Sequence, residues 1–203
     1  MTADRLGGDE DGQTPVDADD AQYLNPAYAS IATRAELNDA EADNITDALL
    51  WLGDQVLSTA DLLCQSFVRE LHQRMFGEVW SWAGQTRRRE TTIGVAPAQI
   101  PERLQILLGD TAYWVEHGTY SESEISIRFH HLLVSIHPFV NGNGRHARLA
   151  AGALADTLGL GPGHLSWGAR GGLPVAEARR QYLAALRQAD RGDYTALLEI
   201  AAN

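Results

Sequence analysis

The chain contains no lysine, only one cysteine and no long apolar run, and each absence narrows its class. All 16 basic residues are therefore arginine, which we interpret as a compositional bias of the source and not as a sign of function. Cys64 alone cannot form an intramolecular disulfide, and we expect a small buried residue there. The longest apolar stretch begins at Leu149, is interrupted by Asp156 and is too short to span a bilayer. The acidic N-terminus does not resemble a secretory signal, so we expect a cytoplasmic protein without membrane contact.

The composition is otherwise that of an ordinary globular domain, with 44% hydrophobic and 21% charged residues in a chain of 203. The formal net charge of −11 argues against direct nucleic-acid binding, which needs clustered cations to neutralise phosphates. Residues 1–20 alone hold seven acidic residues and one basic residue. We therefore expect an acidic, flexible tail over residues 1–30, with Tyr23, Leu24 and Tyr28 fixing its end to a single domain over 31–203.

Apolar residues recur at helical spacing through most of this domain, which predicts a mainly α-helical fold. Capping-box patterns occur at Thr33–Glu36 and Ser121–Glu124. The one stretch with clear β character, residues 87–96, predicts a short β-hairpin. The expected helices cover approximately residues 33–52, 59–75, 97–115, 121–136, 144–158, 175–188 and 194–201.

One stretch of this acidic chain, residues 125–155, contains no Asp or Glu at all. It nevertheless holds three arginines and four histidines, so we expect a locally cationic site for an anionic ligand. Those residues are Arg128, Arg145, Arg148, His130, His131, His137 and His146. The histidine spacing matches no strong zinc pattern and no cysteine or acid joins it, so zinc is not expected.

A glycine-rich turn within this stretch predicts a phosphate-binding helix N-terminus. Gly142 and Gly144 allow a tight turn of backbone N–H groups, and a helix is expected to begin directly after them. Arg145 and Arg148 lie three residues apart and share a face, although helix N-termini disfavour cations. A bound phosphate would explain both arginines. His137 precedes the turn, and its imidazole could take the proton of an attacking hydroxyl.

The same residues form a recognisable motif. His137-Pro-Phe-Val-Asn-Gly-Asn-Gly-Arg145-His-Ala-Arg148 resembles the Fic family signature His-Pro-Phe-x-Asp/Glu-Gly-Asn-Gly-Arg-x-x-Arg and differs from it only at Asn141. The segments Leu71–Phe76 and Trp80–Gly84 are similar to the helix and connection that precede the flap of that family. The resemblance extends over residues 33–203, and its details are most like the branch called mobile mystery protein B, found in bacterial mobile elements.

This resemblance implies a protein adenylyltransferase, which moves AMP from ATP, with Mg²⁺ or Mn²⁺, to a hydroxyl side chain of a target protein. It implies that His137 is the general base and that Ile93, Gly94 and Val95 form a flap that docks the target by strand addition. It also implies a small helix-turn-helix antitoxin or regulator as a partner. The remaining motif residues divide into structural Pro138 and Phe139, and nucleotide-binding Gly142, Asn143, Gly144, Arg145 and Arg148.

Asn141 is the one departure from the signature, because the family usually has a magnesium-binding Asp or Glu there. An amide oxygen is neutral, so we expect at most a weak ligand to a phosphate-bound Mg²⁺. Three outcomes stay open: slower AMP transfer, transfer from a different phosphate-containing donor, or a nucleotide- or partner-binding module without turnover. The related Doc kinases carry Lys in place of the second glycine of the loop, and Gly144 argues against that activity here.

Several other features have a simpler interpretation. His72 and His164 are expected to be surface or hydrogen-bonded residues, and most tryptophans to be core. Arg87–Arg89 could discourage strand aggregation or guide an acidic target. Thr195–Glu199 resembles part of the family's inhibitory helix, but Ile200 breaks that pattern, so restraint by a partner in trans is the expected alternative.

Overall fold

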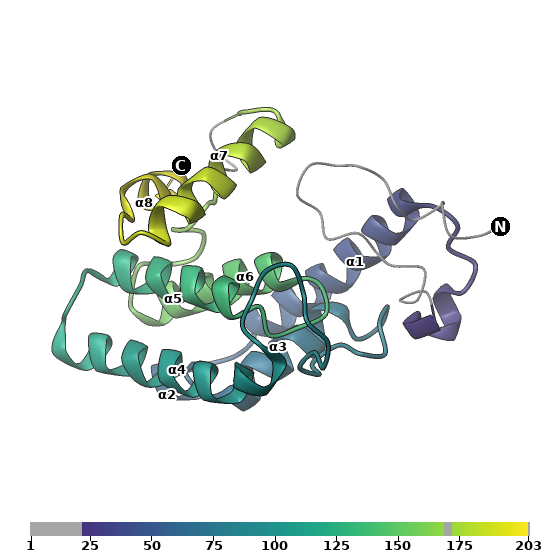
Figure 1. Cartoon of the computed structure of the whole chain (residues 1–203), viewed down its shortest axis with the longest axis horizontal. Coiled ribbons are helices and arrows are strands. Elements are labelled where there is room, and N and C mark those ends of the chain that lie inside the picture. Colours follow the sequence, from purple (N-terminus) through teal and green to yellow (C-terminus); the bar gives the residue numbers. More distant parts are fainter. Residues whose placement is uncertain (1–21, 169–171, 203) are drawn as a thin grey trace.

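Helices form nearly all of the regular structure in residues 22–168 and 172–202, the part that the computed structural model describes (Figure 1). This confirms the predicted mainly helical fold. The elements are η2 Pro26–Tyr28, α1 Arg34–Gly53, α2 Thr59–Leu62, α3 Gln65–Phe76, η3 Pro97–Gln99, α4 Ile100–His117, α5 Glu122–Ile136, α6 Asn143–Thr157, α7 Val175–Ala189 and α8 Thr195–Ala202. Most of the predicted 1–30 tail lies outside the described residues.

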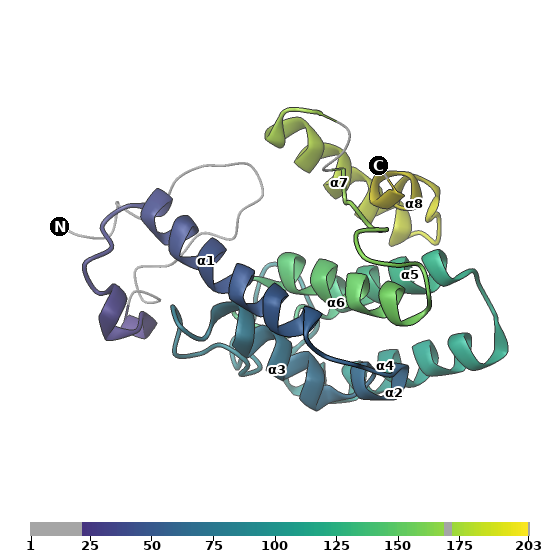
Figure 2. The ribbon, with the colours of Figure 1, turned by 180° about the vertical axis from the view of Figure 1, so that it is seen from behind.

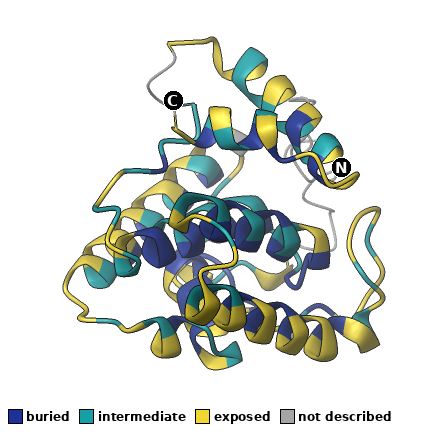
Figure 3. Ribbon diagram, turned by 90° about the vertical axis from the view of Figure 1, so that its left-hand side faces the viewer, coloured by how far each residue is buried: buried dark blue, intermediate teal, exposed yellow. Residues whose placement is uncertain are grey.

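Helices α5 and α6 lie at the centre of the molecule and make the most extensive helix pair (Figures 1 and 2). Helix α4 packs along α5, α3 packs against α6 and α1, and α7 and α8 pair with each other beyond α5. Buried residues gather along these central helices, while exposed residues follow the outer faces (Figure 3). The link between α5 and α6 is therefore held in the middle of the core.

Local signals explain where several helices begin and end. Thr33 and Glu36 form the predicted reciprocal capping box of α1. Ser121 caps α5, but the Glu124 carboxylate pairs with Arg128 instead of completing a box. Gly118 ends α4 in the left-handed conformation, with φ 56°.

The single helix expected over residues 59–75 is wrong, because the chain leaves the helical region at Leu63 and Cys64 and starts α3 anew. Ser58 caps the short α2 with a reciprocal Asp61 bond, which starts a helix that Leu63 then ends. Cys64 is half-buried, not fully buried as expected, and its thiol contacts the Asp61 carbonyl at 3.1 Å.

The segment before α1 is fixed to the turn that follows α3. Leu24 forms an isolated antiparallel bridge with Trp80, and the Asn25 side chain donates to the carbonyls of Gly77 and Glu78 at 2.8 and 2.7 Å. Leu24 and Tyr28 also pack against the core. These contacts hold residues 24–28 beside residues 77–84, the tryptophan-rich connection that follows α3.

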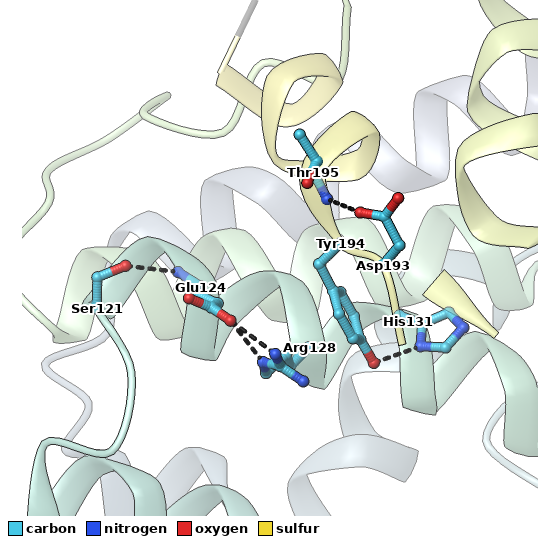
Figure 4. Close-up of polar contacts among 7 residues, drawn as sticks. All are labelled: Ser121, Glu124, Arg128, His131, Asp193, Tyr194 and Thr195. Atoms are coloured by element: carbon cyan, nitrogen blue, oxygen red, sulfur yellow. Dashed lines mark hydrogen bonds and ion pairs between the residues drawn. The ribbon is translucent and has the colours of Figure 1, made fainter. Parts of the chain in front are cut away.

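Polar contacts dock the C-terminal helices on α5 (Figure 4). The His131 ring bonds the Tyr194 hydroxyl through Nδ1 and the Asp190 carboxylate through Nε2, both at 2.9 Å. The Arg128 guanidinium lies over the rings of Tyr120 and Tyr194, at 4.0 and 4.1 Å from their centroids. Asp193 accepts a bond from the Thr195 N–H where α8 begins.

The predicted β-hairpin over residues 87–96 is not seen. Within the described part of the chain, the one β pairing is the bridge between Leu24 and Trp80. The backbone N–H groups of residues 87 and 95 do not pair across a hairpin: the Arg87 N–H donates to the Pro138 carbonyl and the Val95 N–H to the Ile136 carbonyl. These long-range bonds use the groups that a hairpin would pair.

Among the described helices, none is both long and apolar enough to cross a membrane.

A buried amide joins α1 to the end of α3 and gives a stability prediction. Asn44 is 5% exposed; it donates to the Arg74 carbonyl at 2.9 Å and accepts from the Glu78 N–H at 3.0 Å. Asn44→Ala should lower the free energy of unfolding by about 2 kcal/mol, because two buried backbone groups lose their partners. Urea unfolding measures this, with exposed Asp43→Ala on the same helix as the matched control. Equal stability of the two variants would contradict the prediction.

Candidate active site

His137 lies at the sharp turn that ends α5. Its backbone is left-handed, with φ 54° and ψ 59°, as the following proline disfavours the right-handed helical region. The residue is 5% exposed, and its Nδ1 has no hydrogen-bond partner among the described residues. The turn therefore presents a nearly buried imidazole beside the start of α6.

Phe139 and Asn143 close the loop that follows His137. The Asn143 side chain accepts from the Phe139 N–H and donates to the Phe139 carbonyl, both at 2.9 Å. Phe139 is fully buried and stacks on His72, with ring centroids 3.7 Å apart. Because the Asn143 amide is committed to the loop, a ligand would meet its backbone N–H and not its side chain.

His72 fixes this loop from α3, a role that the sequence did not indicate. Its Nδ1 accepts from the Gly84 N–H at 3.0 Å, so the neutral ring carries its proton on Nε2, which lies 3.1 Å from the Asn141 carbonyl. The side chain is fully buried and hydrogen-bonded, so the second of the two expectations for His72, a hydrogen-bonded residue, is confirmed and the surface position is not. His72 thus joins the tryptophan-rich connection to the motif loop.

The two glycines of the motif serve different needs. Gly142 has φ 77°, and a Cβ there would lie 2.5 Å from the Phe76 ring, so the fold itself requires glycine. Gly144 lies in the first turn of α6, and a Cβ there would meet no atom within 4 Å. The space above Gly144 is open to a ligand that approaches the backbone.

The first turn of α6 offers several backbone donors. No side chain among the described residues caps it, and it contains no acid. The first bond across the turn runs from the His146 N–H to the Gly142 carbonyl, which leaves the N–H groups of residues 143–145 without helical partners. Such a turn attracts anions.

The two motif arginines are held by different elements. The Arg145 Nη1 forms an ion pair with the Glu41 carboxylate of α1 at 2.7 Å. The Arg148 guanidinium lies 5.4 Å from the ring centroid of Tyr182 on α7, whose hydroxyl bonds His130 at 3.0 Å. Both partners come from outside the acid-free stretch.

Arg87 attaches the predicted flap to His137. Its guanidinium donates to the His137 carbonyl at 2.7 Å, to the Arg89 carbonyl at 3.0 Å and to the Val95 carbonyl. The residue is 2% exposed, so it is neither a solvated edge nor a surface guide, although Arg88 and Arg89 are exposed.

Gly94 lies directly over His137, because a Cβ there would come within 2.6 Å of the His137 Cβ. Ile93 is 57% exposed and Val95 is half-buried.

Burial governs the charge of the site. It lowers the pKa of His137 to about 4, the Arg87 charge adds to this effect, and the Val134 carbonyl opposes it. The imidazole is therefore neutral at pH 7 and able to accept a proton.

Asn141 presents a neutral amide to the motif loop. Its Oδ1 accepts the Gly142 N–H at 2.6 Å, which leaves one lone pair of this oxygen for a further contact. No cluster of three or more metal-binding side chains occurs in the described part of the chain.

Comparison with known proteins agrees with this geometry, since the model of the Fic/DOC family matches residues 62–155. The chain contains a Fic/DOC family domain. It is 31% identical over 151 residues to protein adenylyltransferase fic-1 of Caenorhabditis elegans and 34% identical over 100 residues to protein adenylyltransferase Fic of Drosophila virilis. These alignments cover 72% and 47% of this chain but 28% and 20% of the relatives. The chain thus spans less than a third of the length of either relative.

Solved structures extend the likeness of the Fic/DOC domain over most of the chain. The fragment of Fic-1 from C. elegans aligns with a TM-score of 0.60 at 26% identity, covering 78% of this chain and 45% of that one. The N-terminal FIC domain of Bep8 from Bartonella sp. 1-1C aligns with a TM-score of 0.67 at 20% identity, covering 90% and 94%. The latter supports the fold alone.

The two motif glycines give a matched pair of variants. Gly142→Ala should destabilise the Fic/DOC domain by several kcal/mol, since its Cβ would overlap Phe76 at a left-handed backbone position. Gly144→Ala should raise the stability by about 0.5–1 kcal/mol, because alanine favours a helix and the space is open. Thermal unfolding distinguishes them, and a stable Gly142→Ala would refute the packing argument.

Four buried histidines predict acid sensitivity. Burial lowers the pKa of His137 and His146 to about 4, and that of His72 and His130 well below 6.5. As the pH falls below 6.5, these histidines bind protons in the unfolded chain but not in the folded one. The free energy of unfolding therefore decreases towards pH 4. Between pH 7.5 and 5.5 the loss from His137 and His146 together should reach roughly 3 kcal/mol, and His72 and His130 should add to it in the same direction.

Urea unfolding at several pH values measures this slope. His146→Gln removes one of the buried rings and should give a flatter dependence, whatever its effect on stability at pH 7.5. A free energy of unfolding that stays constant from pH 7.5 to 5.5 would contradict the prediction.

Proposed function

We propose that the protein is an adenylyltransferase that moves AMP from ATP to a hydroxyl side chain of a target protein. The observation that carries this proposal is the pairing of a neutral, nearly buried His137 with the uncapped first turn of α6 and its open space at Gly144. The names of the relatives and the matched family domain support it. BepC of Bartonella tribocorum, which has this fold at 15% identity, is a protein solved with AMPPNP bound.

In this proposal the phosphates lie along the first turn of α6. The N–H groups at residues 143–145 contact them, and Gly144 lets them approach the backbone. Arg145 contacts the outer phosphates and Arg148 supports them. The phosphates of ATP would hold Mg²⁺ or Mn²⁺, with Asn141 as at most a weak further ligand, and the ion would offset the phosphate charge.

The reaction forms a bond between the target oxygen and the α-phosphorus and breaks the bond from that phosphorus to the oxygen that bridges it to the β-phosphate. His137 takes the hydroxyl proton, and pyrophosphate leaves with the bridging oxygen. Phosphate charge near His137 would raise its pKa from about 4 towards neutrality and make it a stronger base. Pro138 and Phe139 set the direction of the loop that carries it.

The target segment would lie along residues 93–95, next to the base. Ile93 offers an exposed apolar side chain, and Gly94 lies over His137. Since no strand occurs at residues 87–96, strand addition would require local extension of this segment. The resemblance to the mobile mystery protein B branch further suggests a cytoplasmic bacterial protein, toxin-like, with a small helix-turn-helix partner.

The second candidate is a nucleotide- or partner-binding domain with weak or no transferase activity, or one that uses another donor. The observation that favours it is the neutral amide of Asn141, whose oxygen accepts the Gly142 N–H, in a loop of residues 137–144 that contains no Asp or Glu.

Labelled ATP separates these functions. The purified protein and a bacterial lysate are incubated with α-labelled or γ-labelled ATP and Mg²⁺ or Mn²⁺. Label from the α position alone, lost by at least about 100-fold in His137→Ala because the general base is missing, is the expected result. ATP affinity of that variant should be retained.

Matched variants sharpen this experiment. Asn141→Asp should increase transfer by supplying an anionic magnesium ligand, and Gly144→Ala, which keeps the fold, should reduce it. Label from the γ position alone would indicate a kinase. Absence of label even in Asn141→Asp, with ATP still bound, would reject AMP transfer and favour the binding domain.

A further inference from the structure

A buried carboxylate on α1 lies next to the proposed nucleotide site. Glu41 is 2% exposed, and its Oε1 accepts from the indole N–H of Trp80 at 2.7 Å. Its Oε2 pairs with Nη1 of Arg145 at 2.7 Å. Trp80 is itself 1% exposed and stacks on Trp82, with ring centroids 5.0 Å apart. The position of the carboxylate is therefore set by the core and not by solvent.

The Arg145 guanidinium is held on two sides. Glu41 binds one side, and the Phe76 ring lies 4.9 Å from the guanidinium carbon. The same ring blocks a side chain at Gly142, so Phe76 places Arg145 against the turn that begins α6. The arginine side chain remains 34% exposed, in contrast to 3% for Glu41, so its outer donors face solvent.

We propose that Glu41 is a positioning residue that orients Arg145 toward the outer phosphates of the bound nucleotide. This inference rests on the proposed function. A free arginine side chain samples many rotamers, and ordering it when the ligand binds weakens affinity. An arginine already fixed by a carboxylate and a ring avoids that loss.

The geometry favours a pair that stays intact over one that a ligand breaks. If the phosphates drew Arg145 away, Glu41 would remain as an unpaired buried charge, which is strongly unfavourable. Arginine carries five N–H donors in a planar fork, so it can bind Glu41 through one edge and phosphate through another. The carboxylate also offsets the cost of placing a cation at the helix N-terminus.

The test compares the affinities of ATP, AMP and inorganic tripolyphosphate for native protein and Glu41→Gln. Glutamine keeps the size of the side chain and an acceptor for Trp80, but it removes the charge that holds Arg145. Affinity for ATP and tripolyphosphate should fall about tenfold, because Arg145 must then be ordered by the ligand. Affinity for AMP should be nearly unchanged, since AMP lacks the outer phosphates.

Three further variants make the result specific. Glu70→Gln neutralises an exposed carboxylate that pairs with Arg74, and it should leave all three affinities unchanged. In an Arg145→Ala background, Glu41→Gln should cause no further loss of ATP affinity. If Glu41→Gln fails to fold, Glu41→Asp, which keeps the charge but shortens the side chain, should give a smaller loss with the same selectivity for outer phosphates.

The outcomes separate this inference from the proposed function. Unchanged or tighter ATP binding by Glu41→Gln, an equal loss of AMP binding, or an additive loss in the Arg145→Ala background would overturn the positioning role. If native protein and Asn141→Asp both bind tripolyphosphate and ATP but transfer no AMP, the proposed function is rejected, and the role of Glu41 is still decided by affinity. Native protein that binds neither ligand would overturn both.

Discussion

The buried ring of His72 is the contact on which the rest of the site depends. One nitrogen accepts the Gly84 N–H, the other lies against the Asn141 carbonyl, and one face stacks on Phe139. A single neutral imidazole thus joins the segment after α3, at Gly84, to the loop between α5 and α6. Both nitrogens and one face of the ring are used, so few other side chains could replace it. The position of the loop follows from this contact, and the directions of His137 and of the first turn of α6 follow from the loop.

Much of the helical fold could be predicted because its signals are local. The Thr33 capping box, the Gly118 end of α4 and the effect of Pro138 on His137 each depend on residues within one turn. The break at Leu63 and Cys64 was missed because the apolar spacing continues through it. The hairpin prediction failed because β propensity does not reveal the partner: the backbone at Arg87 and Val95 bonds residues about 40 to 50 positions later.

The residues of the site also fall into those that the sequence could reveal and those that it could not. The turn from His137 to Arg148 could be recognised because its residues are adjacent in sequence. Glu41 and His72 could not be recognised, because a buried glutamate or histidine in a helix has the same sequence appearance as a surface one. The remaining signal was indirect: two arginines in the first two turns of a helix that has no acid in its first turn imply partners elsewhere. Glu41 is 104 residues before Arg145, and only the packing of α1 on α3 brings them together.

The attachment of residues 87–95 has a consequence for selectivity. Arg87 and Val95 bond the backbone of residues 136–138, the same short segment that carries His137. A displacement of this segment would therefore move the imidazole and the neighbouring strip of backbone as one unit. A peptide seated on that strip would keep a constant separation from the imidazole. Under the proposed function, the number of residues between the docked segment and a hydroxyl group would then decide which hydroxyl reacts, more than the shape of the peptide's surroundings.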